Sequence, residues 1–150
     1  MDIEIAKALA DYGPKLAAAK DHPYDVSGYT VNKNWGSETW LALTEYYAFK
    51  IIKMKAGCKS SLQSHKTKVE ANLVVEGQVE VFLETSPGHT RSRLYGPGQG
   101  WVVPAGIKHR VIAITDYVAI ETSSPHLDDV TRYDDEWGRA DGKIESEHTV

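Results

Sequence analysis

The sequence predicts an all-β domain in which antiparallel strands form a sandwich or a barrel. From about Val26 onward, short runs rich in Val, Ile, Tyr and Thr alternate with turn residues at close intervals. No helical segment alternates with these runs, which argues against a parallel nucleotide-binding sheet. The length of 150 residues, with 41% hydrophobic and 25% charged residues, is typical of one soluble globular domain.

The arm at residues 1–30 is predicted to be helical. Within residues 3–20, the apolar side chains Ile5, Ala8 and Tyr12 recur at helical spacing. The pair Gly13–Pro14 predicts a break, which leaves one broken helix or two short ones. We expect the arm to pack on the outside of the domain or on a partner subunit.

The barrel is predicted to span residues 31–125. We expect strands near residues 27–33, 45–55, 61–65, 71–76, 78–84, 92–95, 101–103, 109–114 and 117–123. The runs on either side of Glu76–Gly77 are typical of a hairpin.

The extension at residues 126–150 is acidic, with eight acidic and three basic residues. It contains few aliphatic residues, and Tyr133 and Trp137 are its candidate anchors. The net charge of the whole chain is −4, whereas a nucleic-acid-binding domain is normally strongly basic. We therefore expect no nucleic-acid partner.

The sequence lacks the segments that would direct a protein to a membrane or to the secretory pathway. No run approaches the roughly 20 apolar residues that a membrane helix needs. The N-terminus lacks the basic and apolar segments of a secretory signal, and Cys58 is the single cysteine. The sequence therefore predicts a cytoplasmic protein without a membrane partner.

A run of lysines lies between Lys50 and Lys68, where the chain has six lysines and no acidic residue. Such a local positive patch suits a small anionic ligand. A lysine-rich run is more typical of a solvated strand edge, where lysines discourage aggregation. The sequence leaves both interpretations open.

Two segments carry a candidate metal site. Gln63 and His65 are two residues apart, so on a strand their side chains share a face. The polar stretch Lys66–Lys68 is a natural bend that returns Glu70 to the same side, and His109 follows a Pro-Ala-Gly turn. If the two segments face each other across a barrel, one amide oxygen, two imidazoles and one carboxylate converge. This mixture of donors suits a divalent transition metal without selecting which one.

The spacing of these residues resembles that of the cupin superfamily. The first segment reads G-x5-[HQ]-x-H-x4-E-x6-G from Gly57 to Gly77, and the second reads G-x5-P-x-G-x2-H from Gly98 to His109. Gln63 stands where most members have a histidine, and Ala113 where an asparagine often follows. The resemblance implies a double-stranded β-helix, or jelly-roll barrel, of two facing sheets around a metal ion, often as a dimer.

A narrower resemblance is to the type II mannose-6-phosphate isomerases, whose isomerase part would here stand alone. It rests on Asn34-Trp35-Gly36-Ser37, Ser61-Leu62-Gln63-Ser64-His65, Val103–His109 and the stretch Leu127–Arg139, which ends in Trp137-Gly138-Arg139. In that family the corresponding set binds zinc or a similar divalent ion. The resemblance thus implies one divalent metal, zinc first and Fe, Mn, Co or Ni as alternatives, held by Gln63, His65, Glu70 and His109.

Substrate contacts are predicted from strand parity and from the same resemblance. Lys68 lies two residues before Glu70, and Ser61 lies two before Gln63, so both can face the metal. Arg132 and Arg139 belong to the arginine-bearing tail motif, and Trp35 is a candidate pocket wall. The predicted substrate-binding residues are Ser61, Lys68, Trp35, Arg132 and Arg139, and the predicted catalytic residues are Lys68 and Arg139.

The predicted function is a metal-dependent sugar-phosphate isomerase of the mannose-6-phosphate/fructose-6-phosphate type, acting through an enediolate. The general base stays open between Lys68 with a lowered pKa, a hydroxide on the metal and a residue of the tail. The alternatives are another metal-dependent cupin enzyme, an oxygenase or a sugar epimerase, and a non-catalytic sugar-binding cupin. The expected partners are a small sugar phosphate and a second copy of the chain in a homodimer, because the arm and the open barrel edges invite pairing.

Overall fold

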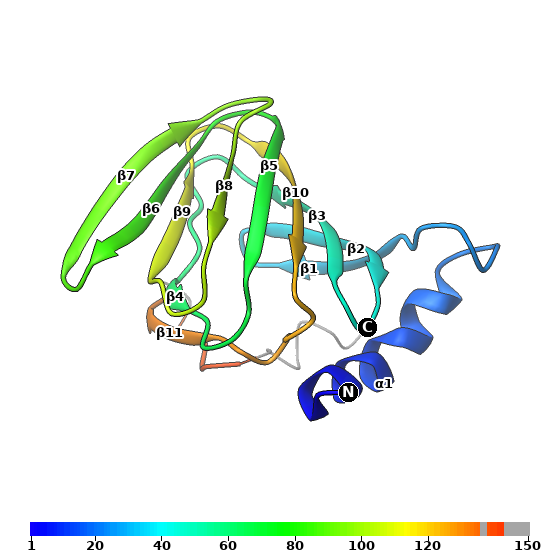
Figure 1. Ribbon diagram of the computed structural model, residues 1–150. Helices are drawn as coiled ribbons and strands as arrows, with labels where there is room; N and C mark the ends of the chain where they lie inside the picture. Colours follow the sequence, from blue (N-terminus) through cyan, green and yellow to red (C-terminus); the bar gives the residue numbers. More distant parts are fainter. Residues whose placement is uncertain (136–137, 143–150) are drawn as a thin grey trace.

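The computed structural model describes residues 1–135 and 138–142, which form two facing antiparallel sheets and one helix (Figure 1). This confirms the predicted all-β barrel with a helical arm. The elements are α1 (Ile3–Ala18), β1 (Tyr29–Lys33), β2 (Gly36–Leu43), β3 (Ala48–Met54), β4 (Leu62–Ser64), β5 (Glu70–Glu76), β6 (Val79–Ser86), β7 (His89–Tyr95), β8 (Gly100–Val103), β9 (His109–Ala113), β10 (Tyr117–Ser123) and β11 (Thr131–Asp134).

The two sheets have six and five strands. The first has the order β1-β2-β3-β10-β5-β8, and the second has the order β11-β4-β9-β6-β7. Their inner faces pack around a core that includes Val74, Val79, Val103 and Ala119, each at most 1% exposed. Alternate residues of each strand face this core, as strand geometry requires.

The predicted hairpin around Glu76–Gly77 is wrong. β5 belongs to the six-stranded sheet and β6 to the five-stranded sheet, so the turn carries the chain from one sheet to the other. Gly77 has φ of +82°, and a Cβ there would lie 2.1 Å from the Asp116 carbonyl oxygen. The turn signal was therefore correct, but short-range sequence cannot distinguish a hairpin from a crossing between sheets. β6 pairs instead with β7 and β9.

The predicted break in the arm is also wrong, because α1 continues through Pro14. Pro14 has no N–H to donate to the preceding turn, so packing has to compensate for the missing hydrogen bond. Tyr12 stacks on Trp40 of β2 with ring centroids 5.0 Å apart, and Ala8 and Leu16 are buried on the same stripe. At the other end, the Asp2 carboxylate accepts the Glu4 N–H at 2.7 Å and caps the helix.

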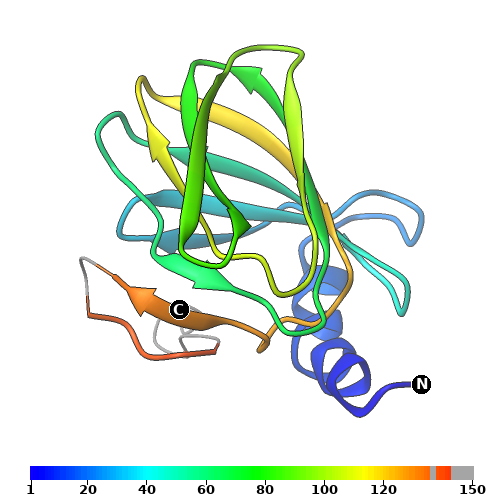
Figure 2. The same ribbon diagram turned by 60° about the vertical axis from the view of Figure 1, so that its left-hand side comes forward.

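Two strands were not predicted, β2 and β11. β2 starts with Gly-Ser-Glu and pairs between β1 and β3, so its neighbours rather than its own composition make it a strand. β11 lies in the acidic extension and pairs with β4. In Figures 1 and 2 this orange segment crosses the end of the barrel where β4 lies. Residues 136–137 and 143–150 of the extension, Trp137 included, lie outside the described residues.

Within the described residues, α1 is the one helix, and it lacks the length and apolar character needed to cross a bilayer. The apolar stripe of α1 is buried against β2 of the same chain. The arm therefore does not require a partner subunit to cover this stripe.

We predict that Tyr12→Ala removes the main contact between the arm and the barrel. The free energy of unfolding should fall by about 3 kcal/mol, as for other buried aromatic truncations. Thermal and urea unfolding would measure the loss. Ile3→Ala is the control, because Ile3 is 86% exposed on the same helix. Equal stability of the two variants would contradict the packing role of Tyr12.

Candidate metal centre

The four predicted ligand side chains come from both sheets and meet at one end of the barrel. Gln63 on β4 pairs in register with His109 on β9, His65 follows β4, and Glu70 begins β5 in the facing sheet. His109 Nε2 lies 3.3 Å from Glu70 Oε1 and 3.5 Å from the Gln63 amide nitrogen. The ring centroids of His65 and His109 are 5.0 Å apart.

Both imidazoles are oriented by backbone carbonyls. His65 Nδ1 donates to the Asp129 oxygen at 2.7 Å, and His109 Nδ1 donates to the Ile107 oxygen at 2.9 Å. Each ring therefore presents Nε2 as a lone pair, the arrangement common to metal-bound histidines. His65 Nε2 is buried and has no hydrogen-bond partner. Burial and the neighbouring Lys68 lower the pKa of His65 to about 4, which keeps the ring neutral.

The donor atoms of His65, Glu70 and His109 all lie within 4.8 Å of one another. A buried, unpartnered imidazole nitrogen beside a carboxylate fits a divalent ion better than it fits a dry core. Gln63 adds a fourth group, whose Oε1 accepts from Ser61 Oγ at 3.0 Å. Turning this amide over would direct Oε1 toward the cluster and let Nε2 donate to Ser61.

Asp129 fixes the bend between His65 and Glu70. Its carboxylate accepts the backbone N–H groups of Lys66, Thr67 and Lys68 at 2.8, 2.6 and 2.8 Å. Partial burial alone would raise the pKa of Asp129, but these three hydrogen bonds lower it below its ordinary value. The same residue thus orients one histidine through its carbonyl and shapes the ligand loop through its carboxylate.

A network of buried charges continues from the cluster across the six-stranded sheet. Lys68 Nζ lies 3.3 Å from Glu70 Oε2 and 3.9 Å from Glu121 Oε1. Lys50 Nζ lies 3.7 Å from Glu121 Oε2 and 3.8 Å from Glu38 Oε1. All of these side chains are less than one-fifth exposed, so the charges are compensated mainly by one another.

The two central carboxyl groups have opposite protonation preferences. Burial and the adjacent Glu70 raise the pKa of Glu121 to about 8. The pKa of Glu70 lies well below its usual value because Lys68 outweighs the effect of burial. The pKa of Lys68 is raised, since Glu121 and Glu70 outweigh the desolvation of its ammonium group. The proposal of Lys68 as a base with a lowered pKa is therefore wrong, and Lys68 stands in the site as a cation.

Sequence reasoning missed Glu38, Lys50 and Glu121. For two of them strand parity was an available signal. Lys50 lies two residues from the buried Ala48 and Ile52 on β3 and shares their inward face, and Glu121 shares the inward face of β10 in the same way. Glu38 lies on β2, the strand that was not predicted.

These groups line one cavity of about 160 Å³ inside the barrel. All the residues predicted to contact substrate or metal line it except His109, which belongs to the ligand cluster. Trp35 and Ser61 are buried in its wall. Among the described residues, its cationic side chains outnumber its acidic ones. The cations are Lys33, Lys50, Lys68, Arg132 and Arg139, and the acids are Glu38, Glu70 and Glu121.

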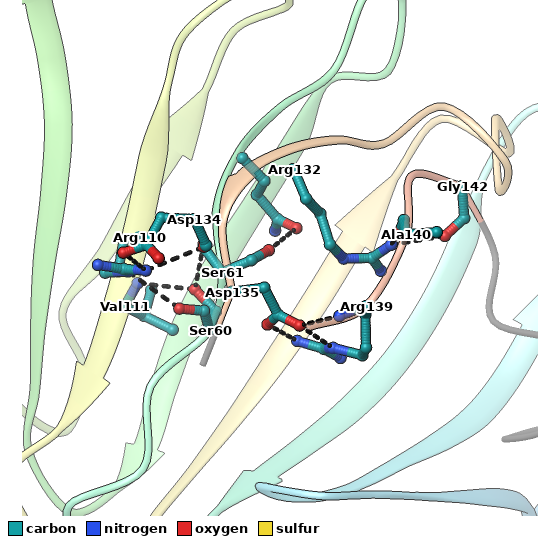
Figure 3. A network of polar contacts seen from close by, with 11 residues as sticks. Ser60, Ser61, Arg110, Val111, Arg132, Asp134, Asp135, Arg139, Ala140 and Gly142 are labelled. Carbon is teal, nitrogen blue, oxygen red and sulfur yellow. Dashed lines mark hydrogen bonds and ion pairs between the residues drawn. The ribbon is translucent and has the colours of Figure 1, made fainter. Parts of the chain in front are cut away.

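The tail contributes two arginines to the cavity wall, and Figure 3 shows their contacts with other residues of the tail. Arg139 forms a forked ion pair with Asp135, with Nη2–Oδ1 at 2.8 Å and Nε–Oδ2 at 3.0 Å. Arg132 Nη1 donates to the carbonyls of Ala140 and Gly142. Both side chains therefore also hold the tail in place.

The lysines of the run differ in exposure. Lys50 and Lys68 are buried in the cavity, Lys59 is half-buried, and Lys53, Lys55 and Lys66 are exposed. On β3, strand alternation separates the buried Lys50 from the exposed Lys53.

A two-sheet antiparallel barrel that encloses a cluster of two histidines and a glutamate is the architecture of a cupin. The family model for the C-terminal part of mannose-6-phosphate isomerase matches residues 21–135. The chain belongs to this family. No curated protein matches the chain.

Solved cupin structures share the fold at low sequence identity. KdgF from Halomonas sp. is 24% identical, with a TM-score of 0.54 over 62% of this chain and 88% of its own. Oxalate decarboxylase from Bacillus subtilis is 17% identical, with a TM-score of 0.63 over 71% and 30% of the two chains. The capsular polysaccharide assembling protein CapF from Staphylococcus aureus is 22% identical, with a TM-score of 0.61 over 71% and 34%. The chain therefore aligns with about a third of the length of oxalate decarboxylase and of CapF.

We predict that Asp129→Ala destabilises the fold by about 1–3 kcal/mol, because three backbone donors lose a charged acceptor. The pKa of Asp129 is lower in the folded state than in the unfolded state, where it is about 3.9. The stabilisation that Asp129 provides is therefore present above the unfolded-state pKa and is lost as the pH falls through the folded-state pKa. Urea unfolding between pH 7 and pH 3 measures both effects. Asp25→Ala, at an exposed site, is the control. An unchanged pH profile in the Asp129 variant would contradict this role.

Proposed function

We propose that the protein is a metal-dependent isomerase that interconverts an aldose phosphate and a ketose phosphate, with mannose-6-phosphate and fructose-6-phosphate as the first pair. The observation that carries the proposal is the Lys68 ammonium group, which lies beside the His/Glu cluster inside a cation-rich cavity. A cavity of this charge favours an anionic ligand such as a phosphate ester. The family match supports the sugar class.

In this proposal Gln63, His65, Glu70 and His109 hold one divalent ion, zinc first and Fe, Mn, Co or Ni as alternatives. When bound, the ion supplies a Lewis acid that polarises the sugar carbonyl and stabilises the enediolate. The neutral state of His65 favours metal binding at physiological pH.

The remaining residues act on the substrate. Lys68 stabilises the negative charge that develops on the enediolate oxygens, and this role requires the cation that the site maintains. Arg132 and Arg139, which line the tail side of the cavity, hold the phosphate. Ser61 positions Gln63 and binds a hydroxyl group, while Trp35 forms an apolar wall. The isomerisation requires a base that takes the proton from C2 and returns it to C1 while a proton moves from O2 to O1, and Lys68, which stays a cation, is not that base.

We predict that His65→Ala and His109→Ala each abolish stoichiometric metal binding. Each removes one imidazole donor from a site with few ligands. Elemental analysis of the purified, dialysed proteins provides the measurement. His89→Ala is the matched control, because His89 is exposed on β7. Metal content equal to that of the unaltered protein in both site variants would refute the ligand set.

We predict that Lys68→Met reduces turnover by a factor of about 10²–10³ while leaving the metal content unchanged, since one electrostatic contact to the transition state is lost. Lys66→Met is the control, because Lys66 is exposed two residues away. The assay follows metal-loaded protein with a panel of hexose, pentose and heptose phosphates. Absence of turnover on the whole panel would overturn the isomerase proposal.

The same metal-loaded protein distinguishes the isomerase from the alternative functions. Oxygen uptake by the iron-loaded protein would identify an oxygenase. Calorimetric binding of sugars or sugar phosphates without turnover would identify a non-catalytic sugar-binding cupin.

A further inference from the structure

The first turn of α1 meets the segment that follows β10 at a second cluster of metal-ligating side chains. Figures 1 and 2 both show this segment, at the orange end of β10, beside α1. Asp2 and Glu4 lie at the start of α1, and His126 lies three residues after the end of β10. The donor atoms of these three residues all lie within 4.8 Å of one another. None of the three lines the main cavity, so the cluster is separate from the candidate metal centre.

His126 is a buried imidazole that faces one of the two carboxylates. Only 9% of the residue is exposed. Its Nδ1 shares a hydrogen bond of 2.9 Å with Ser124 Oγ, and its Nε2 lies 3.9 Å from Asp2 Oδ2. The second distance exceeds that of a hydrogen bond. When Nδ1 donates to Ser124 Oγ, Nε2 presents a lone pair toward Asp2, which is the arrangement of a metal-bound histidine.

The spacing of the donors fits a shared ion. Ligand atoms that lie about 2.0–2.2 Å from one Zn²⁺ ion are roughly 3–4 Å from each other, and the His126–Asp2 distance of 3.9 Å falls in this range. One imidazole and two carboxylates form a donor set that Zn²⁺ and similar divalent ions accept. The Asp2 side chain is 49% exposed and Glu4 is also exposed, so water has access to the remaining coordination positions.

The N-cap of α1 holds Asp2 in this position. Asp2 Oδ1 accepts the backbone N–H of Glu4 at 2.7 Å, whereas Oδ2 is the oxygen that faces His126. The two carboxylate oxygens can therefore serve different partners. One stabilises the first turn of the helix, and the other is directed toward the buried imidazole.

A second cavity, of about 60 Å³, lies between α1 and the segment that follows β10. Glu4 belongs both to the cluster and to the lining of this cavity. The charged residues of the lining are Glu4, Lys7, Asp11 and Asp128. Three carboxylates and one ammonium group favour a cation over an anion, which is the opposite of the main cavity.

We propose that Asp2, Glu4 and His126 bind a second divalent transition-metal ion, with Zn²⁺ as the first candidate. This ion links the first turn of α1 to the segment between β10 and β11. The same segment continues to Asp129, whose carbonyl orients His65, so the second ion also stabilises one side of the candidate metal centre. The inference is independent of the proposed function.

The first test is the zinc content of the full chain. His126→Ala should contain one zinc ion per chain fewer than the unaltered protein, measured by elemental analysis after zinc loading and dialysis. His22→Ala is the matched control, because His22 is exposed in the loop after α1. The measurement is a difference of one ion, so it holds whether or not the candidate metal centre binds zinc. Equal zinc content in His126→Ala and the unaltered protein would refute the second site.

Asp2→Asn tests a carboxylate ligand while keeping the helix cap. Asparagine caps a helix about as well as aspartate, so α1 should keep its first turn. Loss of the anionic ligand should weaken Zn²⁺ binding at this site by at least about tenfold, measured by isothermal titration calorimetry. Asp21→Asn is the control, at an exposed aspartate outside the helix. The same zinc affinity in both variants would contradict a role of Asp2 as a ligand.

The link between α1 and the neighbouring segment is tested in a His109→Ala background, which lacks one predicted ligand of the candidate metal centre. Zn²⁺ should raise the unfolding temperature of this variant by mass action, and it should not do so in the double variant H109A/H126A. Hydrogen exchange at the backbone amides of the first turns of α1 should slow on zinc addition in the single variant alone. A zinc response that persists in the double variant, or exchange in α1 that zinc leaves unchanged, would show that the ion does not fasten the helix.

Discussion

The main constraint on this structure is the burial of several charged side chains between its two sheets. Glu70, Lys50 and Lys68 lie where each ion loses several kcal/mol of hydration, so each requires an opposite charge or a polar partner at close range. Glu121 lies between the two lysines, and burial beside Glu70 raises its pKa to about 8. Strand register provides those neighbours. Because side chains alternate along a strand, a slip of one residue in a strand would move that strand's charged residue to the outer face. The register of β3, β5 and β10 therefore determines both the core and the cavity.

The sequence contained enough information to predict that the four candidate ligands come together, because they lie at fixed offsets from glycine and proline turns. Those turns determine where β4, β5 and β9 begin, and the strand parity then directs Gln63 and His65 to one face. The lysine–carboxylate network was harder to predict. Lys50 and Glu121 are separated by about seventy residues and become neighbours only when β3 pairs with β10. Local pattern cannot indicate which strands will pair.

The wrong predictions have the same origin. Gly13–Pro14 is a strong local break signal, yet stacking of Tyr12 on Trp40 keeps α1 continuous. The turn at Gly77 has the composition of a hairpin, but its flanking strands find better partners in opposite sheets. In both cases, tertiary contacts outweigh a local preference worth a few kcal/mol at most.

The acidic residues of the extension at residues 126–150 attach it to the barrel next to the candidate site. Asp129 binds the N–H groups of the lysine-rich bend, and Asp134 accepts from Arg110 of the barrel at 3.0 Å. The extension is thus attached to the barrel by its own carboxylates. Because the Asp129 carbonyl also orients His65, displacing the extension would free one ligand of the cluster and remove Arg132 and Arg139 from the cavity wall. The extension therefore completes the candidate site, rather than forming an appendage to the barrel.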